Sequence, residues 1–221
     1  MLPETMPVCP VRGSVIYPTM VMPIDAGRPI SIRAIDEALA RDRVLLIVSQ
    51  RDKEVETPRP SDLFEVGTAC NILKMRKNPD GSVQVLVQAF ARVRVREWLD
   101  LGDHLEARGE VLADELGEPI LVKALVREVK DKFQALLKEG KYLAPEVAQF
   151  ILNLEDPSQL ADYVAFHMDF RLEDKQKVLE TANVAERLRA VLVLLEAELA
   201  LIETQRRIQQ QVKEEIDRNQ R

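Results

Sequence analysis

The stretch VQVLVQAFARVRV, residues 83–95, alternates small or branched apolar side chains with larger or polar ones over its whole length. Successive side chains of a β-strand point to opposite faces, so a period of two predicts a strand with one face in a core and the other in water. Just before it, NPDG at residues 78–81 has a proline suited to the second turn position and a glycine that tolerates positive φ. This turn predicts a hairpin with a preceding strand at residues 69–75.

Three neighbouring segments complete a β-rich lobe around this hairpin. Residues 105–111 alternate again and predict a half-exposed strand, whereas residues 44–48 are apolar throughout and predict a buried strand. SIRAIDEALARD, residues 31–42, instead repeats apolar residues at helical spacing, with Ser31 placed to cap the start. We therefore expect a sheet with one short helix packed on it.

The apolar period changes from two to about 3.6 residues after DELGEP, residues 114–119, and this change predicts a lobe boundary. The predicted fold class is α+β. Its expected parts are a β-rich lobe at 1–116, a helical bundle lobe at 117–182 and a long projecting helix at 183–221.

The last segment is predicted to be one helix because no proline or glycine follows Pro157, and because Asn183 and Glu186 resemble a capping box. A helix of this length extends about 55–60 Å, farther than a small domain is wide, so part of it must project. Its leucine seam ends near Ile202, and beyond that residue the helix is polar nearly all round. We therefore expect the chain to be a fragment of a longer protein.

The overall composition excludes several classes of protein. A chain of 221 residues with 46% hydrophobic residues can bury a sizeable core, and a formal net charge of −6 does not suit a diffuse polyanion-binding surface. The longest apolar run, residues 190–195, is far shorter than the roughly 20 residues that cross a bilayer. The N-terminus lacks the pattern of a secretory signal, and two cysteines are too few for a disulfide framework. We expect a cytoplasmic protein without a membrane partner.

The sequence lacks motifs for catalysis, metal binding or cofactor binding. The only Gly-Lys pair is followed by Tyr142 rather than by Ser or Thr, so no nucleotide-binding loop is encoded. Neither His104 nor His167 has a nearby Cys or His at metal-ligand spacing, and no Gly-x-Ser-x-Gly turn occurs. Cys9 and Cys70 are expected to be small core residues. We expect no catalytic residue, no cofactor and no metal in this chain.

One strand face raises nucleic-acid binding as an alternative function, because an aromatic ring beside guanidiniums can stack a base and pair with phosphates. The residues of this face are Phe90, Arg92, Arg94 and Arg96. Glu106 and Glu110 on a neighbouring strand are the expected ion-pair partners of these arginines. Residues 1–113 carry 15 basic and 16 acidic side chains, so the lobe is not basic overall and the charge balance does not favour this alternative.

Several sequence blocks resemble the start of the bacterial Lon ATP-dependent proteases in order and spacing. They begin with PVCPVRGSVIYPTMVMPIDAGRPISIRAID at residues 7–36 and continue with LLIVSQRD (45–52), NPDGSVQVLVQAFARVRV (78–95), DPSQLADYVAFHM (156–168) and KQKVLETANVAERLRAVLVLLEAEL (175–199). The resemblance covers essentially the whole chain. Cys9 and Thr19 depart from the family pattern, which would place Leu and Gly there, but neither position is catalytic.

The resemblance implies an amino-terminal substrate-recognition region. Such a region has a β-rich lobe similar to the pseudouridine-synthase-associated (PUA-like) fold, a helical lobe and a long helix that leads into an ATPase module. The ATPase and the Ser-Lys peptidase would follow Arg221, so ATP, Mg and every catalytic residue of the family would lie outside this sequence. Members of the family assemble as homohexamers, whereas the fragment alone could be a monomer.

These considerations predict a non-catalytic domain that binds unfolded or damaged proteins and their degrons through exposed apolar patches. Methionine suits such a surface because its thioether side chain is flexible and polarisable. One predicted patch lies on the β-rich lobe and draws on Tyr17, Met20, Met22, Met75, Leu86 and Phe90. A second candidate patch comprises Phe133, Leu137 and Tyr142.

Core packing is the competing interpretation of each of these residues, because apolar side chains at regular spacing usually face inward. Leu86 and Phe90 are favoured as surface residues because their strand face is otherwise lined by Gln and Arg. A stand-alone protein with the same fold, which binds a partner or a small ligand without an ATPase, is a further alternative.

Overall fold

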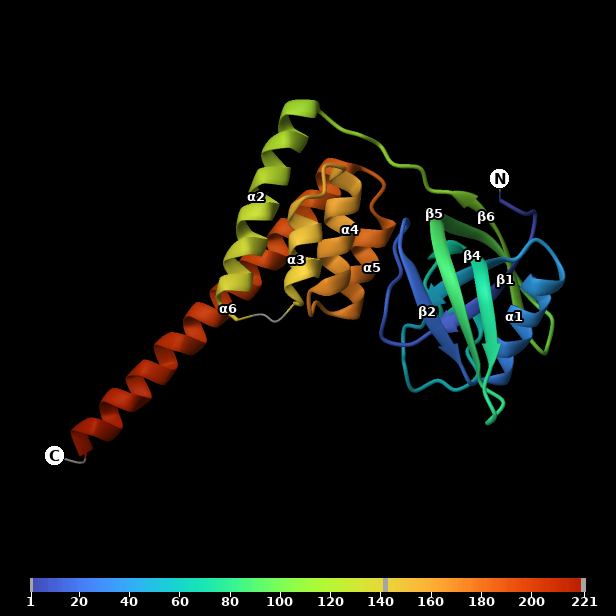
Figure 1. The fold of residues 1–221 in the computed structure, drawn as a ribbon, viewed down its shortest axis with the longest axis horizontal. Helices are drawn as coiled ribbons and strands as arrows, with labels where there is room; N and C mark the ends of the chain where they lie inside the picture. The colour runs from blue at the N-terminus through green and yellow to red at the C-terminus, as the bar shows by residue number, and fades with distance from the viewer. Residues whose placement is uncertain (1, 141–142, 220–221) are drawn as a thin grey trace. The chain divides into compact units, whose positions relative to one another are not determined.

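The computed structural model describes residues 2–140 and 143–219, and its first unit is built on one six-stranded sheet (Figure 1). The order of the strands in this sheet is β2-β5-β4-β3-β1-β6. Their bounds are β1 Met6–Val11, β2 Val21–Ala26, β3 Val44–Ser49, β4 Val66–Lys77, β5 Val83–Asp100 and β6 Leu105–Val111. The mixed sheet and the helices described below confirm the predicted α+β class.

Strand β5 closes the sheet into a barrel because it is long enough to pair with three neighbours. Its first half pairs with β2 and its second half with β6, while β4 runs along most of its other side. Strand β6 also pairs with β1, which completes the ring. Among the described strands β2 pairs with β5 alone, so it is an edge strand, and it carries Pro23.

The alternation that predicted β5 is confirmed by its burial. Val83, Val85, Val87 and Ala89 are all buried in a core cluster with helix α1 (Pro29–Ala40). The predicted hairpin is also present, and Gly81 takes a φ of 87° in its turn.

Strand β3 is buried on both of its faces, as its uninterrupted apolar sequence predicted. Leu45 and Ile47 belong to the core cluster on the α1 side, and Leu46 and Val48 belong to a second cluster with residues of β1, β5 and β6. Helix α1 begins earlier than predicted, because Pro29 supplies a preset φ at its first turn and Arg28 is the N-cap residue. Ser31 is therefore a buried helical residue and not the cap.

Helix α5 (Leu172–Glu180) belongs to the same unit as the sheet, although the sequence placed it in the helical lobe. Arg92 donates from Nε to Leu179 O at 3.1 Å, Gln176 donates from Nε2 to Val66 O at 2.9 Å, and the Tyr17 hydroxyl donates to Lys175 O at 2.7 Å. The first unit thus comprises residues up to 115 together with 168–182.

The second unit comprises residues 116–167 and 183 onward. Its described helices are α2 (Pro119–Lys138), α3 (Pro145–Leu152), α4 (Pro157–His167) and α6 (Val184–Asn219). Helix α2 packs along α6 and buries Val129, Phe133 and Leu136 on one stripe. Glu118 caps α2 by accepting from the backbone N–H groups of Ile120 and Leu121.

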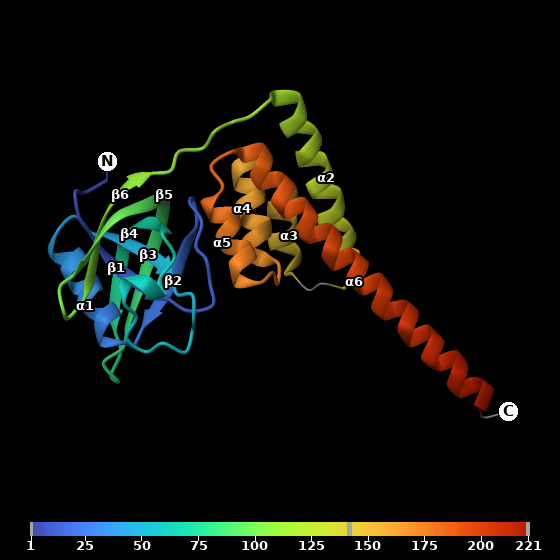
Figure 2. The same ribbon diagram turned by 180° about the vertical axis from the view of Figure 1, so that it is seen from behind.

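The predicted long helix is confirmed as α6, a single helix of 36 residues. The side chain of Asn183 accepts from the backbone N–H of Glu186 at 3.1 Å, which satisfies one free donor at its start. Within the second unit, its later turns extend beyond α2 and α3 and carry mostly exposed residues (Figure 2). No helix in the described part of the chain is both long enough and apolar enough to cross a membrane.

Candidate functional site

Three of the residues predicted for contact patches lie in the core. Tyr17, Met20 and Phe133 are buried, so the prediction of exposed patches is wrong for them. The Tyr17 hydroxyl donates to a carbonyl of α5, and Phe133 lies on the buried stripe of α2. Leu137 is half-buried, and Tyr142 lies outside the described residues. Without Phe133, the second predicted patch does not form as proposed.

The other predicted residues of the β-rich lobe remain accessible to different degrees. Met22 and Leu86 are half-buried, whereas Met75 and Phe90 are 38% and 37% exposed. Met22 packs against the core cluster on the α1 side. Met75 lies opposite buried Val85, so it is on the other face of the hairpin from Leu86.

Two β-bulges in the β4–β5 ladder each present one large apolar side chain. The register shifts between Ala69 and Cys70, which leaves Phe90 as the extra residue of β5. It shifts again just after Ile72, which leaves Leu73 as the extra residue of β4. A bulge removes its extra residue from the ladder and re-aims the side chain. Phe90 and Leu73 are accordingly exposed.

Apolar residues of β2 and β5 extend the same outer face, which lies on three adjacent strands in Figure 1. Pro23 of β2 lies opposite Leu86 of β5, and exposed Val21 lies opposite Gln88. Opposed and diagonal side chains on one face of a sheet lie within about 4.5–8 Å of each other. We call these residues the bulge surface: Val21, Pro23, Leu73, Leu86 and Phe90.

Amides and one lysine lie among the apolar residues of the bulge surface. Gln88 lies between Val21 and Asn71 across the three strands. Gln84 donates from Nε2 to Asp25 Oδ1 at 2.9 Å, and exposed Lys74 lies directly opposite Leu86. Such a surface combines apolar contact with polar and basic groups, which suits partners of varied sequence.

Most of the arginines that suggested nucleic-acid binding make other contacts in the structure. Arg92 is buried beneath α5, so its predicted position on a wet face is wrong. Arg96 pairs with Glu110 as predicted, and this hydrogen bond holds the pKa of Glu110 below its usual value. Arg94 is half-buried. The face therefore does not present a row of free guanidiniums.

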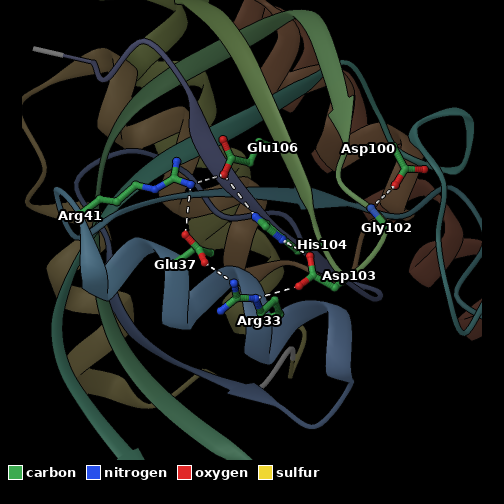
Figure 3. A network of polar contacts seen from close by, with 8 residues as sticks. All are labelled: Arg33, Glu37, Arg41, Asp100, Gly102, Asp103, His104 and Glu106. Atoms are coloured by element: carbon green, nitrogen blue, oxygen red, sulfur yellow. Dashed lines mark hydrogen bonds and ion pairs between the residues drawn. The ribbon is translucent and has the colours of Figure 1, made fainter.

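A polar network joins α1 to the turn between β5 and β6 (Figure 3). His104 is buried, with Nδ1 at 2.6 Å from Asp103 Oδ1 and Nε2 at 3.2 Å from Glu106 Oε1. Arg41, the C-cap residue of α1, donates to Glu106 Oε1 at 2.6 Å, and Arg33 of α1 donates to Asp103 Oδ2 at 2.9 Å. His104 lies beside Asp103 just before β6, and it is far less exposed than a turn residue usually is.

The role of this network is to stabilise the fold. Hydrogen bonds with His104 and Arg33 hold the pKa of Asp103 below its usual value. Burial would raise the pKa of Glu106, but hydrogen bonds with Arg41 and His104 outweigh burial and lower it. Both carboxylates are therefore committed to cations, which stabilises the contact between α1 and β6. Among the residues that the structure describes, no group of three or more His, Cys, Asp or Glu could hold a metal ion.

Neither cysteine is suited to act as a nucleophile. Cys9 and Cys70 are both buried free thiols, which confirms their prediction as core residues. Burial raises the pKa of Cys9 to about 11 and raises the pKa of Cys70 further. The thiolate form of either residue is thus disfavoured near neutral pH.

Comparison with known proteins gives a consistent family. The family model described as "ATP-dependent protease La (LON) substrate-binding domain" matches residues 5–197. The Lon protease of Escherichia coli (strain K12) is 38% identical over 215 residues, which is 97% of this chain and 27% of that protein. The Lon protease of Brevibacillus choshinensis is 34% identical over 216 residues, 98% of this chain and 28% of that protein. The chain thus spans about a quarter of the length of the curated relatives it matches.

Solved structures agree on the fold. The N-terminal domain of the Mycobacterium avium complex Lon protease superposes with a TM-score of 0.72 at 26% identity, covering 87% of this chain and 98% of that one. A Lon N-terminal domain protein from Xanthomonas campestris gives a TM-score of 0.57 at 13% identity, covering 86% of this chain and 97% of that one, and supports the fold alone.

Proposed function

Because the chain belongs to the family of substrate-binding domains of ATP-dependent Lon proteases, we propose that it holds unfolded or damaged protein segments for such a protease. The observation that carries this proposal is the bulge surface, on which two irregularities of the sheet present Phe90 and Leu73 to solvent. Folded proteins hide most large apolar side chains, whereas unfolded segments expose them. A surface with several exposed apolar side chains can therefore distinguish the two states.

Binding at a single bulge surface is expected to be weak. Its five side chains are partly exposed and lie on a sheet face, so each buries only a modest apolar area against a partner. We infer that a homohexameric parent would raise the effective concentration by holding several copies near one unfolded chain. Weak individual contacts allow release, which a protease that must pass its substrate onward requires.

The chemistry of the parent protein is proposed to lie outside this chain. Other domains would bind ATP and Mg, hydrolyse the nucleotide and cleave peptide bonds in the cytoplasm. We expect no catalytic residue in the present chain, and among the described residues the cluster of Arg41, Glu106, His104 and Asp103 is held in ion pairs while both thiols are buried. Its role is to bring protein substrates and their degrons to those domains.

A binding titration with one protein in two states tests this proposal. The labelled 221-residue chain is titrated with a protein kept unfolded by blocking its reduced cysteines, and separately with the native form of that protein. We expect saturable binding of the unfolded form alone. The double variant Phe90→Gln and Leu73→Gln should weaken this binding roughly three- to ten-fold, because it removes two apolar contacts.

The matched control is Val193→Gln, which removes an exposed apolar side chain from α6 instead. It should leave the affinity for the unfolded protein unchanged. Equal binding of the native and unfolded forms would contradict the proposed function. Binding of single-stranded DNA that weakens steeply with salt would favour the nucleic-acid alternative instead.

A further inference from the structure

Four ring side chains form a continuous array on α3 and α4 of the second unit. Phe150 of α3 meets Tyr163 of α4 edge-on, with ring centroids 5.1 Å apart. Tyr163 stacks on His167 one helical turn later at 6.3 Å, and His167 meets Phe166 edge-on at 5.0 Å. The two helices lie side by side (Figure 1), so the array bridges them.

This array is partly open to solvent and was not among the predicted contact residues. Phe150 is 49% exposed, and Tyr163 is half-buried beside it. Large aromatic side chains are usually well covered in a folded domain, so an exposed phenylalanine that contacts another ring marks a candidate contact site. The array lies entirely within the second unit, whereas the bulge surface belongs to the first.

The surroundings of the array carry negative charge. Residues 143–167 contain no Lys or Arg, although the whole chain has 31 of them. Their acidic residues Glu146, Glu155 and Asp156 are exposed, whereas Asp162 is buried and paired with Arg187. Glu146 is exposed one helical turn before Phe150, so the two side chains share one face of α3. Lys130 of α2 reaches this segment, but its ammonium donates to Leu154 O at 2.8 Å, past the end of α3.

We propose that Phe150, Tyr163 and Glu146 form a site for a lysine or arginine side chain of an extended protein substrate. A cation is attracted to the face of an aromatic ring by the quadrupole of the ring, and a neighbouring carboxylate supplies a counter-charge. A phosphate or an acidic segment would be repelled by the same carboxylates. This assignment rests on the proposed function, to which it adds a preference for basic residues within unfolded segments.

The test compares three short Gly-Ser peptides that differ only in a central residue, which is Lys, norleucine or Glu. Norleucine retains the aliphatic chain of Lys and lacks the charge. Chemical-shift titration of the 221-residue chain, followed at the amides of Glu146, Phe150 and Tyr163, reports binding at this site alone. We expect affinity to decrease from Lys to norleucine to Glu, and added salt to weaken the Lys peptide.

Phe150→Leu keeps an apolar side chain and removes the ring. It should weaken the Lys peptide roughly two- to five-fold and leave the norleucine peptide unchanged. Phe90→Leu makes the same chemical change on the bulge surface and serves as the matched control, with no expected effect on the Lys peptide at α3. Glu146→Gln, a change on the exposed face of α3, should also weaken the Lys peptide selectively and covers the case in which Phe150→Leu does not fold.

Equal affinities for the Lys and norleucine peptides would overturn the proposal, as would an equal loss for both in Phe150→Leu. Either result would leave the proposed function intact if the unfolded protein still binds the chain. Failure of the unfolded protein itself to bind would refute the proposed function instead, so the two failures are distinguishable.

Discussion

Arg187 of α6 and Asp162 of α4 form a buried ion pair, with Nη1 at 4.0 Å from Oδ1 and side chains that are 0% and 2% exposed. Arg187 Nη1 also donates to Ser158 Oγ at 2.6 Å, so one guanidinium joins α6 to two positions of α4. Charges are costly to remove from water, and a buried pair is tolerated only when its partners satisfy each other. The pair therefore fixes how these two helices pack.

Removal of one partner of this pair should be far more damaging than removal of both. Asp162→Ala leaves a buried guanidinium without its counter-charge and should lower the free energy of unfolding by about 3–5 kcal/mol. The double variant Asp162→Leu and Arg187→Met removes both charges and should recover most of that loss. Urea unfolding followed by circular dichroism measures both. A double variant no more stable than the single one would contradict this account.

Gly109 of β6 is required by the closure of the barrel. A Cβ at this position would lie 2.5 Å from Val93 Cγ1 and 2.8 Å from Arg94 O, both on the neighbouring strand β5. Gly109→Ala should therefore lower the free energy of unfolding by about 1–3 kcal/mol, because the strands must separate to make room. Thermal unfolding checks this, and Gly27→Ala is the control because a Cβ there meets no atom within 4 Å. Equal melting temperatures for the two variants would exclude the steric explanation.

The network around His104 should make the first unit sensitive to acid. The pKa values of Asp103 and Glu106 are lowered in the folded state, so the unfolded chain binds protons more readily. Their stabilisation is fully present above the ordinary carboxyl pKa values of 3.8 and 4.5 and is lost as the pH falls through the lowered folded values. Urea midpoints measured from neutral pH down to about pH 3 should fall with pH.

Glu106→Gln tests the source of this acid sensitivity. It removes the charge that pairs with Arg41 while it keeps the size of the side chain. The variant should be less stable than the parent at neutral pH, and its stability should depend less on pH below about 5. An unchanged pH dependence would assign the acid sensitivity to other carboxylates.

Helix α5 should detach from the sheet when Arg92 loses its guanidinium. Arg92→Met keeps an apolar side chain beneath the helix but removes the bond to Leu179 O and the ion pair with Asp114. Amide hydrogen exchange at residues 172–180 should become faster, while exchange in β3 stays slow because its contacts are untouched. A global increase in exchange would show that Arg92 supports the whole barrel and not this helix alone.

The sequence correctly predicted the elements whose structure depends on residues close together in the chain. The period of two in β5 reflects burial of one strand face, and the length of α6 reflects the lack of any residue that ends a helix, so both predictions were confirmed. The place of α5 depends on hydrogen bonds from Tyr17 and Arg92 across long stretches of sequence, which no local pattern encodes. For the same reason, Tyr17 and Arg92 were proposed as surface residues although both are buried.

The residues of the candidate surfaces could be predicted only in part from the sequence. Phe90 was favoured as a surface residue because its neighbours on the strand are polar, and its exposure agrees. Leu73 was missed because a bulge is a property of two paired strands and has no signature in one of them. Val21 could have been found, since it alternates with the inward residues Met22 and Ile24. The contact of Phe150 with Tyr163 joins two helices and could not be predicted from either.

Pro23 affects whether another strand can pair with the edge strand β2. Unfolded chains readily add themselves to a bare strand through backbone hydrogen bonds, so a domain with the proposed function would risk seeding aggregates at its edge strand. Strand β2 is such a border, and proline has no N–H with which to continue the ladder. The sheet can thus contact a partner through its side chains, while β2 remains a poor template for the addition of another strand.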